Sequence, residues 1–193
     1  PHEIRIERKI VLPPSGVFVR LREGATDIER QAAERILALF REKAGLSPDG
    51  NTFEIRMGIG EAGEGAGSGG ETRLGRLKSL PNSDQAYVIF PEGDGRLVLA
   101  GLDPRGVFYA AATLCQLLAP YLTPQRAVIP LAEVVDWPDF EERGLWNFPD
   151  PPHWIPWLAG MKLNYGKMAD TRIQPVKRGE PNRQPLALNQ VVR

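Results

Sequence analysis

The sequence predicts an α/β (α+β) fold, a mixed sheet with two amphipathic helices on one face. Residues 86–118 carry most of this prediction, because two short alternating segments flank a turn and lead into one wide apolar stripe. Alternation with a period of two is typical of strands, and apolar spacings of three and four are typical of a helix buried on one side. A second helical pattern, between Thr26 and Gly45, also needs a sheet on which to bury its apolar face.

The first third of the chain predicts two strands and a helix. Residues 4–12 alternate weakly and end at two prolines, which indicates an edge strand because proline cannot donate to a ladder. Residues 17–21 predict a second strand. Thr26 and Glu29 form a capping box, and Gly45 suits the position after the last helical residue. The inner face of this helix would consist of Ile28, Ala32, Ile36, Leu39 and Phe40.

A glycine motif follows the third predicted strand, residues 53–57. Residues 58–63 match G-x-G-x-x-G, and Asp84 lies at a suitable distance for a ribose contact. A pyrophosphate site needs a helix directly after the glycines, whereas residues 64–70 continue with further glycines and acidic groups. We therefore predict a surface loop and keep a nucleotide-binding protein as the third hypothesis. Residues 73–80 are short and mixed and predict no element.

Residues 86–118 predict a hairpin and a buried helix. Glycines in the turn, residues 91–95, accept the positive φ that tight turns require. Asp103 can cap the helix, Pro104 suits its first position, and Pro120 should end it. The apolar stripe consists of Val107, Ala110, Ala111, Leu114, Leu117 and Leu118. Residues 128–135 then predict another extended segment.

Composition excludes several classes of function. Lys and Arg number 24 and Asp and Glu also 24, so the net charge of zero argues against a nucleic-acid partner. Cys115, the single cysteine, allows neither a disulfide within the chain nor a cysteine-built zinc site, and we interpret it as a buried small hydrophobe. We expect no cofactor, no metal and no membrane span. The oligomeric state and the compartment stay open, and a secreted or periplasmic location is the one favoured.

Three motifs resemble one family of carbohydrate-active enzymes. The first is the helix motif, which consists of Gly106, Phe108, Tyr109, Ala110, Thr113, Leu114, Gln116, Leu117 and Leu118. With the preceding hairpin it resembles the accessory domain before the catalytic barrel of family 20 glycoside hydrolases, the β-N-acetylhexosaminidases. Related domains precede the barrels of α-glucuronidases and O-GlcNAc hydrolases. The D-x-P-x-x-x-x-R-G run from Asp136 to Gly144, and K-x-N at residues 162–164, resemble the family's junction and the end of its first barrel helix.

The resemblance implies two domains. Residues 1–140 would form the accessory α/β domain, and residues 141–193 would begin an incomplete (β/α)8 barrel, with a helix over 154–163 and a second strand over 164–170. In this family an adjacent Asp-Glu pair after the fourth barrel strand performs catalysis, and this chain does not reach that strand. We therefore expect no catalytic residue here, a chain that is inactive alone, and a longer parent hydrolase. The carboxylates among residues 133–142 are interpreted as solvated surface groups.

Four residues are candidates for substrate binding: Arg143, Trp146, Asn147 and Asp170. Trp146 and Asn147 would lie where the first barrel strand ends, and Asp170 where the second ends, on the side where barrels bind ligands. The alternative is that Trp146 is a core residue and Asp170 caps a helix or loop. His153 is interpreted as structural.

The sugar stays open. The family's second arginine and its histidine are absent in register after Arg143 and Gly144, so an N-acetylhexosamine substrate is in doubt. The expected partner is an oligosaccharide or glycoconjugate, bound by the parent protein. A second hypothesis is a non-catalytic carbohydrate-binding or interaction module that uses Trp146, Trp154 and Trp157.

Overall fold

The structure, a computed structural model, describes residues 1–60, 70–148 and 151–168. The chain divides into two units, Pro1–Asp139 and Phe140–Arg193, and each is considered by itself. In the part of the chain that the structure describes, no helix is long and apolar enough to cross a membrane.

A six-stranded mixed sheet forms the centre of the first unit, with strand order β1-β6-β4-β5-β3-β2. The strands are β1 (Glu3–Leu12), β2 (Val17–Leu21), β3 (Phe53–Ile59), β4 (Tyr87–Pro91), β5 (Arg96–Gly101) and β6 (Ala127–Asp136). Strands β2, β3 and β5 run parallel to one another, while β4 and β6 join the sheet antiparallel. β1 pairs only with β6, which confirms the edge position predicted from the prolines that follow it.

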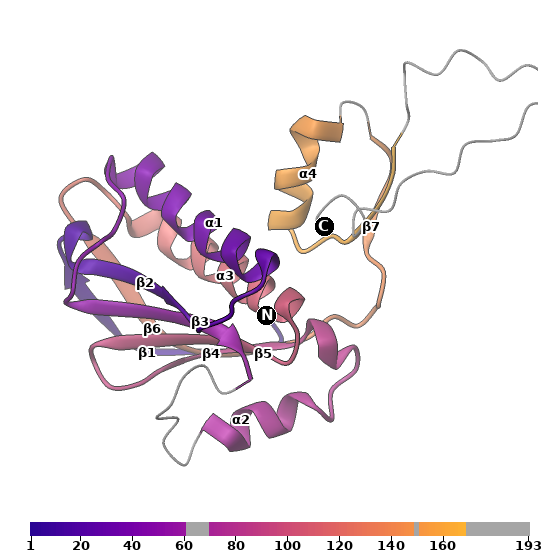
Figure 1. Cartoon of the computed structure of the whole chain (residues 1–193), viewed down its shortest axis with the longest axis horizontal. Helices are drawn as coiled ribbons and strands as arrows, with labels where there is room; N and C mark the ends of the chain where they lie inside the picture. Colours follow the sequence, from indigo (N-terminus) through magenta and orange to yellow (C-terminus); the bar gives the residue numbers. More distant parts are fainter. Residues whose placement is uncertain (61–69, 149–150, 169–193) are drawn as a thin grey trace, which may run out of the picture. The chain divides into compact units, whose positions relative to one another are not determined.

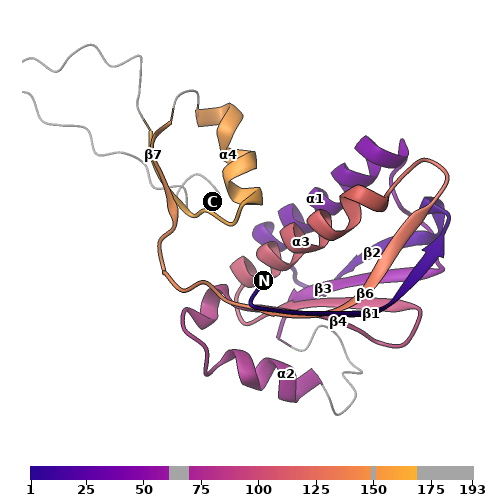
Figure 2. The ribbon, with the colours of Figure 1, turned by 180° about the vertical axis from the view of Figure 1, so that it is seen from behind.

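Helices α1 (Asp27–Ala44) and α3 (Pro104–Leu118) pack side by side on one face of the sheet (Figures 1 and 2). Both predicted starts are confirmed. Thr26 and Glu29 form the capping box, and the Asp103 side chain accepts a hydrogen bond from the Arg105 backbone N–H. Gly45 follows α1 with φ of 73°, a left-handed conformation that glycine adopts without steric cost.

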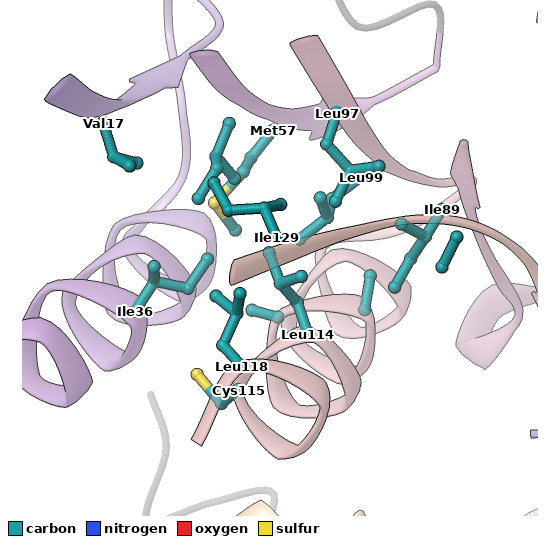
Figure 3. Packing of buried hydrophobic residues seen from close by; sticks show 14 of the residues in the cluster. Val17, Ile36, Met57, Ile89, Leu97, Leu99, Leu114, Cys115, Leu118 and Ile129 are labelled. Carbon is teal, nitrogen blue, oxygen red and sulfur yellow. The ribbon is translucent and has the colours of Figure 1, made fainter. Parts of the chain in front are cut away.

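The main core lies between these two helices and the sheet (Figure 3). It contains side chains from both helices and from β2, β3, β4, β5 and β6, among them Val17, Ile36, Met57, Ile89, Leu97, Leu99, Leu114, Leu118 and Ile129. The start of α3 approaches the sheet closely, since a Cβ at Gly106 would lie 2.3 Å from the Ala86 carbonyl oxygen. Glycine is therefore the residue that fits at this position.

The opposite face of the sheet also carries a helix, which the sequence did not predict. α2 (Gly70–Leu77) buries Leu74 and Leu77 against a second cluster, which contains Ala86, Val88, Phe90, Val98 and Ala100. The prediction of two helices on one face was therefore incomplete. Only two apolar side chains anchor this short helix, too few for a periodic signal. The last three residues of the glycine motif, 61–63, lie outside the described residues.

In the second unit, a helix connects two parallel strands. The strands are β7 (Gly144–Phe148) and β8 (Tyr165–Met168), which pair directly with each other, and the helix is α4 (Pro151–Gly160). Leu158 is fully buried in a small cluster with Ile155 and Leu163. The helix ends at Gly160, three residues earlier than the sequence pattern predicted. The order of strand, helix and strand agrees with the predicted elements, and the barrel itself stays a prediction.

Candidate functional site

Arg143 and Asn164 join the starts of β7 and β8. The Arg143 N–H donates to Asn164 Oδ1 at 2.8 Å, and the Asn164 N–H donates to the Arg143 carbonyl at 2.8 Å. Asn164 Nδ2 also donates to the Glu141 carbonyl at 2.8 Å. Three hydrogen bonds thus fix the register in which the two strands begin.

The Arg143 guanidinium binds backbone carbonyls at the same end of the strand pair. Nη1 donates to Phe140 O at 2.7 Å, while Nε and Nη2 donate to Lys162 O at 3.2 and 2.9 Å. Lys162 has φ of 60°, an uncommon left-handed conformation for a residue with a side chain. In this structure Arg143 therefore holds together the segments that lead into both strands, and its contact with a substrate stays a prediction.

The other end of β7 contains a local irregularity that was not predicted from the sequence. Trp146 pairs with Lys167 and Phe148 pairs with Met168, so Asn147 is an extra residue on β7 without a counterpart on β8. An irregularity of this kind bends a strand locally, and β-bulges are frequent next to active sites. The sequence offers no signal for it, because the irregularity is a property of the pairing between two strands.

The structure brings only part of the predicted substrate site together. Trp146 and Asn147 are neighbours near the carboxyl end of β7, whereas Arg143 lies at its amino end. Asp170 lies outside the described residues, as does the side chain of His153. In α4, the rings of Trp154 and Trp157 meet edge to face with centroids 5.5 Å apart, and the two residues are 37% and 50% exposed.

A polar cluster in the first unit contains Asp136, which was expected from the sequence to be a solvated carboxylate. That interpretation was wrong, because Asp136 is only 8% exposed and accepts a hydrogen bond from the Tyr87 hydroxyl at 2.7 Å. The same hydroxyl also bonds to Thr113 of α3. Asp136 follows the core residues Ala132 and Val134 at a period of two, and this phase was the signal that could have revealed its burial.

Tyr87 and Asp136 face each other across β4 and β6, where they are register partners. Burial, together with the charge of Asp136, raises the pKa of the Tyr87 phenol far above its usual range. The phenol therefore stays protonated and serves Asp136 as a hydrogen-bond donor.

Two further buried carboxylates, Glu29 and Glu54, are held by arginines. Glu29 accepts Arg22 Nε at 2.8 Å and Nη2 at 3.0 Å, as well as the N–H groups of Thr26 and Ile59. Burial acts to raise the pKa of Glu29, but these hydrogen bonds outweigh it and the pKa is lowered. The pKa of Glu54 is lowered in the same way, against burial, by Arg56 and Arg96.

An open groove of about 420 Å³ lies along β1, β4, β6 and α2. Four of its charged side chains pair with one another: Arg73 donates to Glu133 at 2.9 Å, and Arg76 pairs with Glu3. Among the described residues, no group of three or more His, Cys, Asp or Glu side chains is arranged to hold a metal ion. Burial raises the pKa of the Cys115 thiol to about 11, so it is a packed thiol rather than a nucleophile.

A family model matches most of the first unit. Residues 15–137 match the family model described as glycosyl hydrolase family 20, domain 2. The chain belongs to glycosyl hydrolase family 20. This match confirms the resemblance to the accessory domain of the family, and it spans β2 to β6 with all three helices of the first unit.

Solved structures share the fold of this family 20 chain. An exo β-N-acetylglucosaminidase of family 20 from Vibrio harveyi, solved with N-acetylglucosamine, is 18% identical with a TM-score of 0.57, over 87% of this chain and 24% of that chain. A chitobiase from Flavobacterium johnsoniae is 16% identical with a TM-score of 0.61, over 87% of this chain and 26% of that one. The chain thus spans about a quarter of the length of these proteins. No curated protein sequence matches it.

Proposed function

We propose that this chain is the accessory domain and the first part of the catalytic (β/α)8 barrel of a longer glycoside hydrolase, which acts on oligosaccharides or glycoconjugates. One observation carries the proposal: a parallel strand–helix–strand unit, β7-α4-β8, follows directly after the segment that matches the family model. A barrel of this kind closes with eight strands, so a single such unit needs further strands beside it.

The buried glutamates of the accessory unit support the proposal that catalysis takes place elsewhere. A glycosidase needs a carboxyl group that stays protonated near neutral pH, and therefore one with a raised pKa. Glu29 and Glu54 have lowered pKa values and donate nothing, because arginine and backbone N–H groups hold them ionised. Their role is to join elements of the fold.

The carboxyl end of β7 is the part of this chain that we propose to contact the sugar. Ligands of such barrels bind at the carboxyl ends of the strands. Trp146 offers a flat surface for stacking on a sugar ring, Asn147 lies at the bulge, and Asp170 follows the end of β8 in sequence. Arg143 acts from the opposite end, by fixing the start of both strands.

Two measurements test this function. The native polypeptide, detected in its source by an antibody against this chain, should be much larger than the 21.4 kDa of the chain itself. A native mass of about 21 kDa would refute the proposal. The isolated chain should not hydrolyse 4-nitrophenyl N-acetyl-β-glucosaminide or an aryl glucuronide, and turnover that survives repeated purification would also refute it.

A second candidate function is a carbohydrate-binding module that needs no barrel. The exposed Trp154 and Trp157 favour it, because such an aromatic pair offers apolar surface to a sugar. Titration with chito-oligosaccharides should then quench tryptophan fluorescence, and Trp157→Ala should abolish the change while Met161→Ala, another exposed apolar position after α4, should retain it. The barrel proposal instead predicts no saturable change in the isolated chain.

A further inference from the structure

His2 makes an unusual set of contacts with the segment at the end of β6. Its ring stacks on Trp137 with centroids 4.1 Å apart and an angle of 10° between the planes. Nδ1 lies 3.0 Å from Asp136 Oδ1, and the His2 backbone N–H donates to the same oxygen at 3.0 Å. Nε2 lies 3.3 Å from Asp139 Oδ1. His2, the residue that precedes β1, thus contacts three of the four residues of the exit segment, Asp136–Asp139.

The contacts continue into the interior of the first unit. The second oxygen of Asp136 accepts the Tyr87 hydroxyl, which also bonds to Thr113. A continuous polar chain therefore runs from α3, through β4 and the end of β6, to His2. From another side, Asn82 Nδ2 donates to the Pro138 carbonyl at 2.8 Å. The exit segment therefore has contacts from His2, Tyr87 and Asn82, although it has no partner strand beyond Asp136.

This segment is where the polypeptide leaves the first unit, because the second unit begins at Phe140. Segments between domains permit relative motion unless something orders them. Imidazole can combine the three contacts here, because its flat ring stacks and it has a nitrogen on each side that donates to a carboxylate when it carries a proton. Phenylalanine would retain only the stacking, and alanine would retain neither kind of side-chain contact.

We propose that His2 is a positioning residue that fastens the exit segment Asp136–Asp139, so that the beginning of the first unit fixes the path by which the chain leaves it. The contacts lie entirely within the first unit, and the inference holds whether or not the proposed function is correct. Loss of His2 should loosen residues 137–142 while the sheet and its core stay as they are.

NMR on the 193-residue chain tests the contact itself. The sequence has two histidines, so His153→Gln assigns the ring signals of His2. We expect a nuclear Overhauser effect between the ring protons of His2 and those of Trp137. Its absence from a folded chain, judged by dispersed core methyl signals, would overturn the proposal.

Backbone NMR relaxation tests the consequence. In His2→Ala, the order parameters of the N–H groups of Trp137 and residues 139–142 should fall from about 0.85 to below about 0.6, with a smaller change in His2→Phe, since hydrogen bonding of the side chain to a carboxylate is lost in both and stacking only in the first. Asp139→Asn, at an exposed position, should give a small decrease confined to the same N–H groups. Arg5→Ala, an exposed site on β1, is the matched control and should change nothing there. Unchanged order parameters in His2→Ala would overturn the proposal, and so would an equal decrease throughout the first unit.

Discussion

Tyr87→Phe is the sharpest test of the buried polar cluster. The substitution removes one hydroxyl and leaves the ring in place, so apolar packing is preserved. Asp136 loses its donor at 2.7 Å, and Thr113 loses a partner. A hydrogen bond to a charged group contributes about 2 kcal/mol, and the carboxylate oxygen stays buried without that donor. We expect the free energy of unfolding to fall by about 2 kcal/mol.

Urea denaturation followed by far-ultraviolet circular dichroism measures this loss, because α1 and α3 supply most of the helical signal. A loss of about 2 kcal/mol corresponds to a melting temperature lower by roughly 6 to 8 °C for a domain of this size. Tyr121→Phe is the matched control, since Tyr121 is exposed and should change stability by less than about 0.5 kcal/mol. If Tyr87→Phe also loses less than about 0.5 kcal/mol, the cluster is not a stabilising network and the reasoning fails.

The same tyrosine gives the pH dependence a defined sign. The pKa of Tyr87 is raised in the folded chain, whereas an unfolded tyrosine ionises near pH 10. Above about pH 10 the unfolded state therefore binds fewer protons, and stability falls as pH rises. Below that pH the contribution is complete. Tyr87→Phe should show a shallower loss of stability between pH 9 and 11 than the parent chain, and equal slopes would contradict the assignment.

Three further predictions follow from single contacts. Gly106→Ala should lower the free energy of unfolding by about 3 kcal/mol, because the new Cβ would meet the Ala86 carbonyl. Gly75→Ala, with open space around it in α2, should instead raise the free energy of unfolding by about 0.5 kcal/mol in the same urea titration. Because the pKa of Glu29 is lowered in the folded chain, its ionised form stabilises the fold above pH 4.5, and this stability is lost as the pH falls below 4.5. Glu29→Gln should therefore be less stable than the parent chain at pH 7 but lose less stability on acidification, as measured by acid unfolding curves. Cys115 should react with a thiol reagent at pH 8 at least about 100-fold faster in urea than in the native chain, since burial raises its pKa to about 11, and rapid native labelling would show that the thiol is accessible.

Local chemistry predicted most of the first unit. Thr26, Gly45, Asp103 and the turn before β5 act within a few residues, so their signals are complete in the sequence. α2 escaped because its stability comes from the sheet face beneath it, where Leu74 and Leu77 pack, rather than from its own pattern. Propensity cannot reveal a helix that exists because of its partner.

The candidate site was harder to predict, because its geometry depends on pairing between distant residues. The sequence indicated Trp146 and Asn147 through their position at a strand end, but the bulge at Asn147 arises only when β7 meets β8. Arg143 looked like a ligand-binding group because it belongs to a motif. Its contacts with the carbonyls of Phe140 and Lys162 depend on the path of two loops that the sequence does not specify.

The motif residues that carry the resemblance to the family stabilise the fold of the unit in which they lie. Gly106 allows α3 to approach Ala86, and Gly144 allows β7 to approach β8, where a Cβ would lie 1.8 Å from the Tyr165 carbonyl oxygen. Asp136 accepts hydrogen bonds from the Tyr87 hydroxyl and the His2 backbone N–H, and Asn164 joins the starts of β7 and β8. Each position needs one residue type because of backbone approach or hydrogen bonding, and none of them needs a substrate to explain it. The match to family 20, over residues 15–137, therefore reports the fold of the first unit, and a function has to be argued from a site rather than from that fold.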